Sequence, residues 1–120
     1  MEFKSATVLV VEDEPLVRMM AVEIFKDAGY RVCEAADARG ALAILQGRDD
    51  IGAVLTDIKM PGEMNGVGLA AVIREKWPGI AVLVTSGRMR PGEDILPYGI
   101  GFIGKPWRRD EIVGKMAGMV

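Results

Sequence analysis

Short apolar runs alternate with amphipathic stretches along the whole chain. Five runs that are rich in strand-forming residues predict strands at 7–11, 30–35, about 53–56, 81–85 and about 101–104. Between the first four strands and after the fifth, apolar residues recur at helical spacing. This repeated strand-helix order predicts an α/β fold with a parallel sheet that helices cover on both faces.

Turn and cap residues mark where the predicted helices begin and end. In the first helix Pro15 fits the first turn and Gly29 fits the C-terminus. The apolar stripe of this helix consists of Val17, Met20, Ala21, Ile24 and Ala28. Asp37 is predicted to cap a second helix that ends at Gly47. A third helix contains Leu69, Val72, Ile73 and Trp77 and ends before Pro78.

The last third of the chain has weaker helical signals. Residues 93–98 lie between two prolines, so the fourth helix is expected to be short or irregular. The final helix, 110–119, has Ile112, Val113 and Met116 on one face, although Gly114 and Gly118 weaken it. With 120 residues, the chain is expected to form one domain, 1–120.

Composition removes several classes of function. The formal net charge of -2 offers no basic surface for nucleic acid or for an acidic membrane. The absence of histidine removes the commonest zinc ligand and general base, and a single cysteine allows no internal disulfide. No long apolar run resembles a signal peptide or membrane span, so the expected location is the cytoplasm.

Acidic residues follow two of the predicted strands. Glu12, Asp13 and Glu14 follow the first strand, and Asp57 follows the third. The carboxyl ends of parallel strands meet at one edge of the sheet, so these side chains can converge there. Such acids repel one another unless a hard cation neutralises them, and Mg²⁺ suits their oxygens. Taken alone, Glu12, Asp13 and Glu14 also fit solvated loop residues, and this alternative stays open.

Two further strand ends bring a hydroxyl and an ammonium to the same edge. The fourth strand ends in Thr85-Ser86-Gly87, and the fifth ends in Gly104-Lys105-Pro106. Each signal is weak by itself, because Ser86 fits a strand-end cap and Lys105 a surface charge. Together with the carboxylates they can hold a phosphoryl group bridged by a metal ion.

These strand-end motifs resemble the signature blocks of two-component response regulator receiver domains. The resemblance rests on four segments, VLVVEDE (8–14), LTDIKMP (55–61), VLVTSG (82–87) and FIGKP (102–106). It implies a flavodoxin-like, doubly wound sheet of five parallel strands in the order 2-1-3-4-5. It also implies a signalling domain that is not an enzyme toward other substrates and catalyses only its own phosphorylation and dephosphorylation.

Carried over residue by residue, the resemblance assigns a role to each motif. Asp57 is the expected phosphoacceptor, and Ser86 and Lys105 are expected to bind the phosphoryl group. Phe102 stands at the position of the switch aromatic, and the bond before Pro106 at the position of a cis peptide. The expected ligands of Mg²⁺ or Mn²⁺ are Glu12, Asp13, Asp57 and the backbone carbonyl of Lys59. Glu12 stands where the family more often has aspartate and is expected to act through a water.

The resemblance also implies partners. The expected phosphoryl donor is a histidine kinase or phosphotransfer protein. The expected output is contact with a downstream protein or effector domain, and the resemblance is also compatible with a homodimer. An aspartate-nucleophile phosphatase on a similar fold is the alternative. Such an enzyme would need a second acid two residues after its nucleophile, where this chain has Lys59. A nucleotide or flavin domain is disfavoured, because no glycine-rich phosphate loop follows the first strand.

Overall fold

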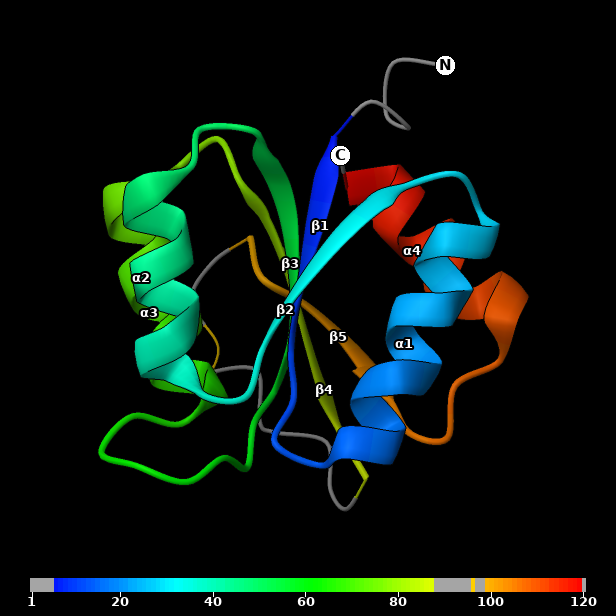
Figure 1. The fold of residues 1–120 in the computed structure, drawn as a ribbon, viewed down its shortest axis with the longest axis horizontal. Coiled ribbons are helices and arrows are strands. Elements are labelled where there is room, and N and C mark those ends of the chain that lie inside the picture. Colours follow the sequence, from blue (N-terminus) through cyan, green and yellow to red (C-terminus); the bar gives the residue numbers. More distant parts are fainter. Residues whose placement is uncertain (1–5, 88–95, 97–98, 120) are drawn as a thin grey trace.

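A central sheet of five parallel strands organises the chain (Figure 1). The computed structural model describes residues 6–87, 96 and 99–119. The strands are β1 (Thr7–Val11), β2 (Arg31–Ala35), β3 (Ile51–Asp57), β4 (Ala81–Ser86) and β5 (Gly101–Gly104). Within the described residues the helices are α1 (Pro15–Asp27), α2 (Ala38–Gly47), α3 (Gly66–Lys76) and α4 (Arg109–Met119). The strand order is β2-β1-β3-β4-β5, which confirms the doubly wound fold.

Helices cover both faces of the sheet and bury two separate clusters of apolar side chains. Helices α1 and α4 lie on one face, and α2 and α3 lie on the other (Figure 1). Side chains alternate along β1, so Val8 and Val10 pack toward α1 and α4, whereas Leu9 and Val11 pack toward α2 and α3. This double burial explains why β1 is a continuous apolar run rather than an alternating one.

The helix ends follow the local signals in the sequence. Asp37 Oδ1 accepts a hydrogen bond from Gly40 N at 2.8 Å, which confirms it as the cap of α2. Asn65 caps α3 in the same way, through a 3.0 Å bond from Gly68 N. Gly29 has a φ of 100°, which suits the residue that closes α1.

Some local predictions need correction. Met20 is 55% exposed and does not belong to the buried stripe of α1. It lies one residue, or about 100°, around the helix from the fully buried Ala21, so it falls outside the face that packs on the sheet. Strand β3 is longer than expected and includes Asp57, and Tyr30 precedes β2 rather than belonging to it.

The short or irregular helix predicted at 93–98 falls, apart from residue 96, outside the described residues. The final predicted helix is α4, with Ile112 and Met116 fully buried. Of the helices described, none is both long and apolar enough to cross a membrane.

Replacing Gly114 with alanine is expected to stabilise the protein. Gly114 lies inside α4, and a Cβ built there meets no atom within 4 Å. Alanine loses less backbone entropy than glycine on helix formation, so Gly114→Ala should raise the free energy of unfolding by about 0.5–1 kcal/mol. Urea denaturation measures this change, and a loss of stability would contradict the open environment of Gly114.

The ion pair before β3 predicts a specific loss of stability in acid. Hydrogen bonds lower the pKa of Asp50 from 3.8 to about 2, with the larger contribution from Arg48 and a smaller one from Thr7. Because the folded pKa is depressed, the contribution of Asp50 is fully present above pH ~4 and disappears toward pH ~2. The difference in unfolding free energy between the wild type and Asp50→Asn should therefore shrink over this range. A difference that does not vary with pH would contradict the pairing.

Candidate functional site

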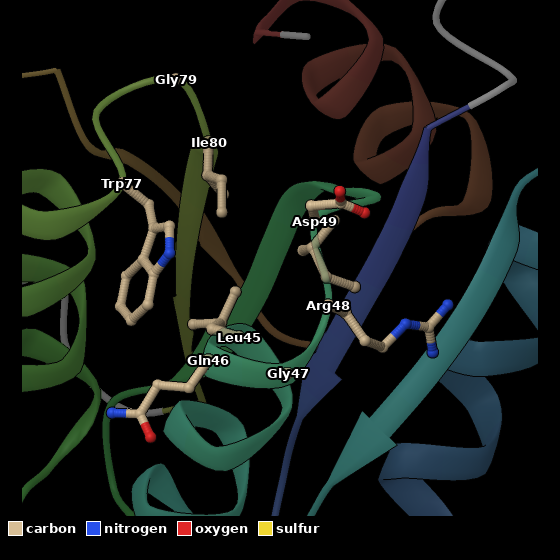
Figure 2. Close-up of a pocket in the computed structure, with 9 residues that line it drawn as sticks. Leu45, Gln46, Gly47, Arg48, Asp49, Trp77, Gly79 and Ile80 are labelled. Atoms are coloured by element: carbon tan, nitrogen blue, oxygen red, sulfur yellow. The ribbon is translucent and has the colours of Figure 1, made fainter.

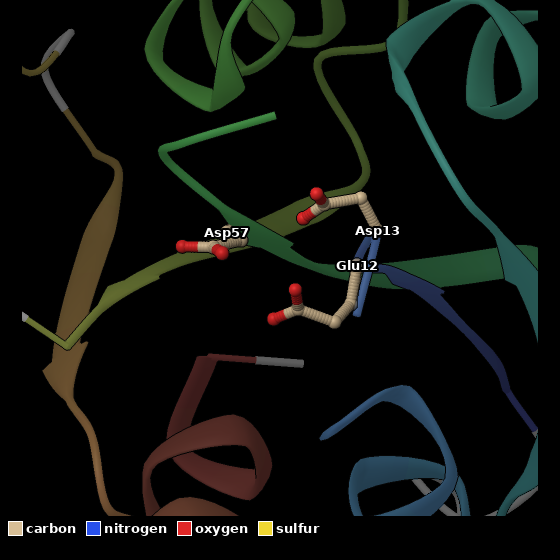
Figure 3. A group of neighbouring side chains, drawn as sticks. All are labelled: Glu12, Asp13 and Asp57. Atoms are coloured by element: carbon tan, nitrogen blue, oxygen red, sulfur yellow. The ribbon is translucent and has the colours of Figure 1, made fainter. Parts of the chain in front are cut away.

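Glu12 and Asp13 extend from the end of β1. Just after this strand, Glu12 N donates a backbone hydrogen bond to Ala35 O of β2 at 3.0 Å, and the chain then turns toward α1. Glu12 is 2% exposed, whereas Asp13 is more exposed. Figure 3 shows both carboxylates pointing from the end of β1 toward Asp57.

Asp57 is the last residue of β3 and is 8% exposed. Strand β4 holds the chain at this point, because Ile58 N donates to Thr85 O at 3.0 Å. The three acids Glu12, Asp13 and Asp57 can each offer a carboxylate oxygen within 4.8 Å of the others (Figure 3). The structure therefore brings together acids from two chain segments that are distant in sequence. Asp13 and Asp57, the closest pair in sequence between these segments, are 44 residues apart.

Lys105 reaches this acid cluster from the end of β5. Its Nζ lies 2.7 Å from Glu12 Oε1 and 3.2 Å from Asp57 Oδ2. Lys105 N donates to Ser86 O at 2.9 Å, which continues the pairing of β4 with β5. The peptide bond between Lys105 and Pro106 is cis, as the resemblance to receiver domains implied. The ammonium thus lies between the buried acid that follows β1 and the buried acid that ends β3.

The electrostatics of Glu12 and Lys105 reflect this packing. Burial raises the pKa of Glu12, and the charge of Asp57 adds to this, while hydrogen bonds from Lys105 and Glu14 N oppose it. Burial by itself lowers the pKa of Lys105, but the hydrogen bond and charge of Glu12 and the charge of Asp57 outweigh it and raise the pKa. Lys105 therefore remains an ammonium at neutral pH.

The donor set fits a hard divalent cation. One ammonium cannot neutralise three carboxylates, so the cluster retains an excess of negative charge. Carboxylate oxygens are the ligands that Mg²⁺ prefers, and Mn²⁺ accepts the same set. Lys59 is exposed in the loop that follows Asp57, and the role of its carbonyl stays a prediction.

Ser86 ends β4 and accepts a hydrogen bond from the backbone of Lys105, whereas Phe102 lies further back from the acids, within β5. Ser86 is half-buried and pairs in register with Gly104. Phe102 lies in β5 beside Val84 and packs, half-buried, against the apolar cluster under α2 and α3. Their predicted roles, binding the phosphoryl group and switching, stay predictions.

Three contacts that support this site were not predicted from the sequence. Gly66 N donates to Ile58 O at 2.8 Å, which packs the start of α3 against the end of β3. Arg18 donates to the carbonyl oxygen of Glu12 at 2.8 Å. The indole of Trp107 donates to Thr85 Oγ1 at 2.9 Å, and its ring centre lies 5.7 Å from Lys105 Nζ. No motif indicated these contacts, because each depends on how a helix or loop packs against the end of a strand.

A groove of about 650 Å³ lies at the opposite end of the sheet from the acids (Figure 2). Its walls come from the end of α2 and from the turn between α3 and β4. The side chains that line it include Leu45, Arg48, Ile51, Trp77 and Ile80. Ile51 begins β3 and Asp57 ends it, so this groove is separate from the acid cluster.

Comparison with known proteins agrees with the geometry. The family model of the response regulator receiver domain matches residues 8–117. A putative NtrX-like response regulator of Rickettsia bellii is 34% identical over 88% of this chain and 23% of its own length. The aerobic respiration control protein ArcA of Escherichia coli K12 is 37% identical over 88% of this chain and 44% of its own length. The chain therefore spans less than half of these curated relatives.

Solved structures show the same fold. The response regulator TrrA of Thermotoga maritima, determined in complex with Mg(2+)-BeF, has a TM-score of 0.87 and 25% identity, covering 96% of this chain and 99% of TrrA. The chemotaxis protein CheY4 of Vibrio cholerae has a TM-score of 0.83 and 26% identity, covering 96% of this chain and 98% of CheY4. The strand order, the acid cluster and these matches agree, and the chain belongs to the response regulator receiver domain family of two-component systems.

Proposed function

We propose that Asp57 accepts a phosphoryl group and that the chain works as the phosphoacceptor domain of a two-component system. The observation that carries this proposal is the contact of Lys105 Nζ with both Glu12 and Asp57 inside a cluster of three carboxylates. An ammonium beside a carboxylate nucleophile can pair with the oxygens of an arriving phosphoryl group.

The transfer itself needs only a short path. A carboxylate oxygen of Asp57 attacks phosphorus and forms a P–O bond, while the bond from phosphorus to the donor breaks. The donor leaves with that electron pair, and for a phosphohistidine donor the released imidazole nitrogen takes a proton from water. Lys105 is already 3.2 Å from Asp57 Oδ2, so its shift toward the phosphoryl oxygens is small. The Ser86 hydroxyl donates to another of those oxygens.

Glu12, Asp13, Asp57 and the carbonyl of Lys59 would hold Mg²⁺ or Mn²⁺ at this site. When bound, such an ion neutralises charge on the carboxylates and on the phosphoryl oxygens. Glu12 is engaged by Lys105, so we assign it contact through a water rather than directly. The similar TrrA structure was determined in complex with Mg(2+)-BeF, which supports metal binding by this chain.

The output of the domain is a change in protein contacts. Phe102 lies in β5, the strand that Lys105 follows, and turns inward when Ser86 moves toward the phosphoryl group. The donor is a histidine kinase or phosphotransfer protein, and the receiver is a downstream protein or effector domain in the cytoplasm. Relatives of this chain include the sensor kinase CckA of Brucella abortus and the hydrogenase transcriptional regulatory protein HoxA of Cupriavidus necator, which supports partners of these kinds. No turnover of other substrates is part of this function.

Intact-mass measurement after incubation with acetyl phosphate tests the proposal. The chain should gain one phosphoryl group when Mg²⁺ is present and none when EDTA replaces it. Absence of label in Mg²⁺ would count against the phosphoacceptor role. Steady turnover of a phosphomonoester would instead favour the aspartate-nucleophile phosphatase.

A further inference from the structure

Arg18 ties three separate segments together beside the acid cluster. Its Nη1 donates to Glu12 O at 2.8 Å, and its Nε donates to Glu34 Oε1 at 2.9 Å. Its own backbone N–H donates to Glu14 O at 2.9 Å in the first turn of α1. The side chain of Arg18 is only 21% exposed, so the guanidinium is held between α1, the end of β1 and β2.

The carbonyl that Arg18 contacts lies just beyond the hydrogen-bonded ladder of the sheet. The registered pairs of β1 with β2 and with β3 both end at Val11. Glu12 N still bonds to β2 through Ala35 O, but Glu12 O receives the guanidinium of Arg18. Because the peptide group is planar, holding this oxygen also holds the amide of Asp13 and the direction in which Asp13 leaves the strand.

We propose that Arg18 is a positioning residue for Asp13 and that Glu34 orients Arg18. This inference rests on the proposed function, because it concerns Asp13 as a metal ligand. Arg18 contacts the backbone of the acid pair and not its carboxylates, so it sets their position and does not neutralise them. The planar fork of arginine suits two acceptors at once, here a carbonyl and a carboxylate.

The expected effect of losing Arg18 is weaker metal binding. Mg²⁺ demands a narrow geometry, and removing a group that orients a ligand typically costs tenfold to a hundredfold in metal affinity. Arg18→Met keeps much of the side-chain stem but removes both donors. We expect about a tenfold weaker Mg²⁺ affinity, measured by calorimetric titration of the chain with MgCl₂.

Two further variants and one control sharpen this experiment. Arg18→Lys keeps the charge without the fork, so it should recover part of the affinity that Arg18→Met loses. Glu34→Gln keeps an acceptor oxygen and weakens only the orientation of Arg18, so its loss should be about threefold. Arg109→Met is the matched control, because it breaks the exposed pair between Arg109 of α4 and Asp27 of α1 and should leave Mg²⁺ affinity unchanged.

A purely structural role would give a different result. In that case Arg18→Met would lower the free energy of unfolding in EDTA without changing the Mg²⁺ affinity of the folded protein. The positioning role predicts that the Mg²⁺ concentration for half-maximal phosphorylation by acetyl phosphate rises, while the rate at saturating Mg²⁺ stays near that of the wild type. An affinity of Arg18→Met within about twofold of the wild type would overturn the proposal. If Arg18→Met does not fold, unchanged affinity in Glu34→Gln overturns it.

Asp13→Asn separates failure of this inference from failure of the proposed function. Loss of Mg²⁺ binding in Asp13→Asn, together with wild-type binding in Arg18→Met, would remove only the positioning role. A wild type that binds no Mg²⁺ and accepts no phosphoryl group would overturn both proposals.

Discussion

Asp57→Asn should accept no phosphoryl group from acetyl phosphate under conditions in which the wild type is labelled. An asparagine amide has nearly the shape of the carboxylate but is not a nucleophile. The side chain lies at the end of β3, 3.2 Å from Lys105 Nζ, and an amide oxygen can still accept a hydrogen bond there. The fold should therefore persist, and intact-mass measurement should show the loss of label alone.

Measuring the stability of Asp57→Asn distinguishes a specific loss of labelling from unfolding of the protein. The charge of Asp57 contributes to the raised pKa of Glu12, so neutralising Asp57 relieves repulsion within the cluster. Asp57→Asn should then be at least as stable as the wild type in EDTA. Asp50→Asn, at the other end of β3, removes a charge far from the cluster and should be labelled normally. Undiminished labelling of Asp57→Asn would place the acceptor on another residue.

Gly66→Ala should damage both the fold and the site. A Cβ at Gly66 would lie 2.0 Å from Asp57 O, 2.7 Å from Asp57 C and 2.8 Å from Ile58 Cα. All three are backbone atoms, so the clash cannot be relieved by turning a side chain. We expect the free energy of unfolding to fall by about 3 kcal/mol, at the upper end of the cost of overpacking.

The same clash should also displace Asp57, the expected phosphoacceptor. Pushing α3 away from Asp57 breaks the bond from Gly66 N to Ile58 O, or else displaces Asp57 from Lys105. Labelling of the folded fraction should therefore slow, as measured by mass against time. Gly114→Ala is the matched control, because the same change in α4 meets open space and should stabilise the protein. A Gly66→Ala protein with wild-type stability and labelling rate would contradict the close contact.

Local patterns in the sequence predicted most of the fold because the apolar positions of an element reflect which of its faces are buried. The run at 7–11 is buried on both faces, and its composition alone indicates a central parallel strand. The cap at Asp37 and the closing glycine at Gly29 were predictable because each acts on backbone groups a few residues away. Met20 was assigned wrongly, since a stripe of apolar residues does not reveal which edge of it the sheet covers.

The candidate site was also predictable only in part. Acids at the ends of two strands and a lysine at the end of a third predicted a shared edge, because all parallel strands end on one side. The structure brings Glu12, Asp13, Asp57 and Lys105 together there. The sequence did not predict that Lys105 lies closer to Glu12 than to Asp57. A long flexible side chain can reach several acids, and the distances in the folded protein determine which of them it contacts.

Local residue patterns specify the order of elements, most of the buried faces and the residue types at the carboxyl edge of the sheet. These features depend on periodicity and on local backbone chemistry, which short stretches of chain encode. Two features that support Asp57 and Asp13 arise only in the folded chain: the absence of a Cβ at Gly66 lets α3 approach Asp57, and the guanidinium of Arg18 donates to Glu12 O. Such contacts depend on the register of the strands and on how closely each helix packs against the sheet, and no local pattern records either distance.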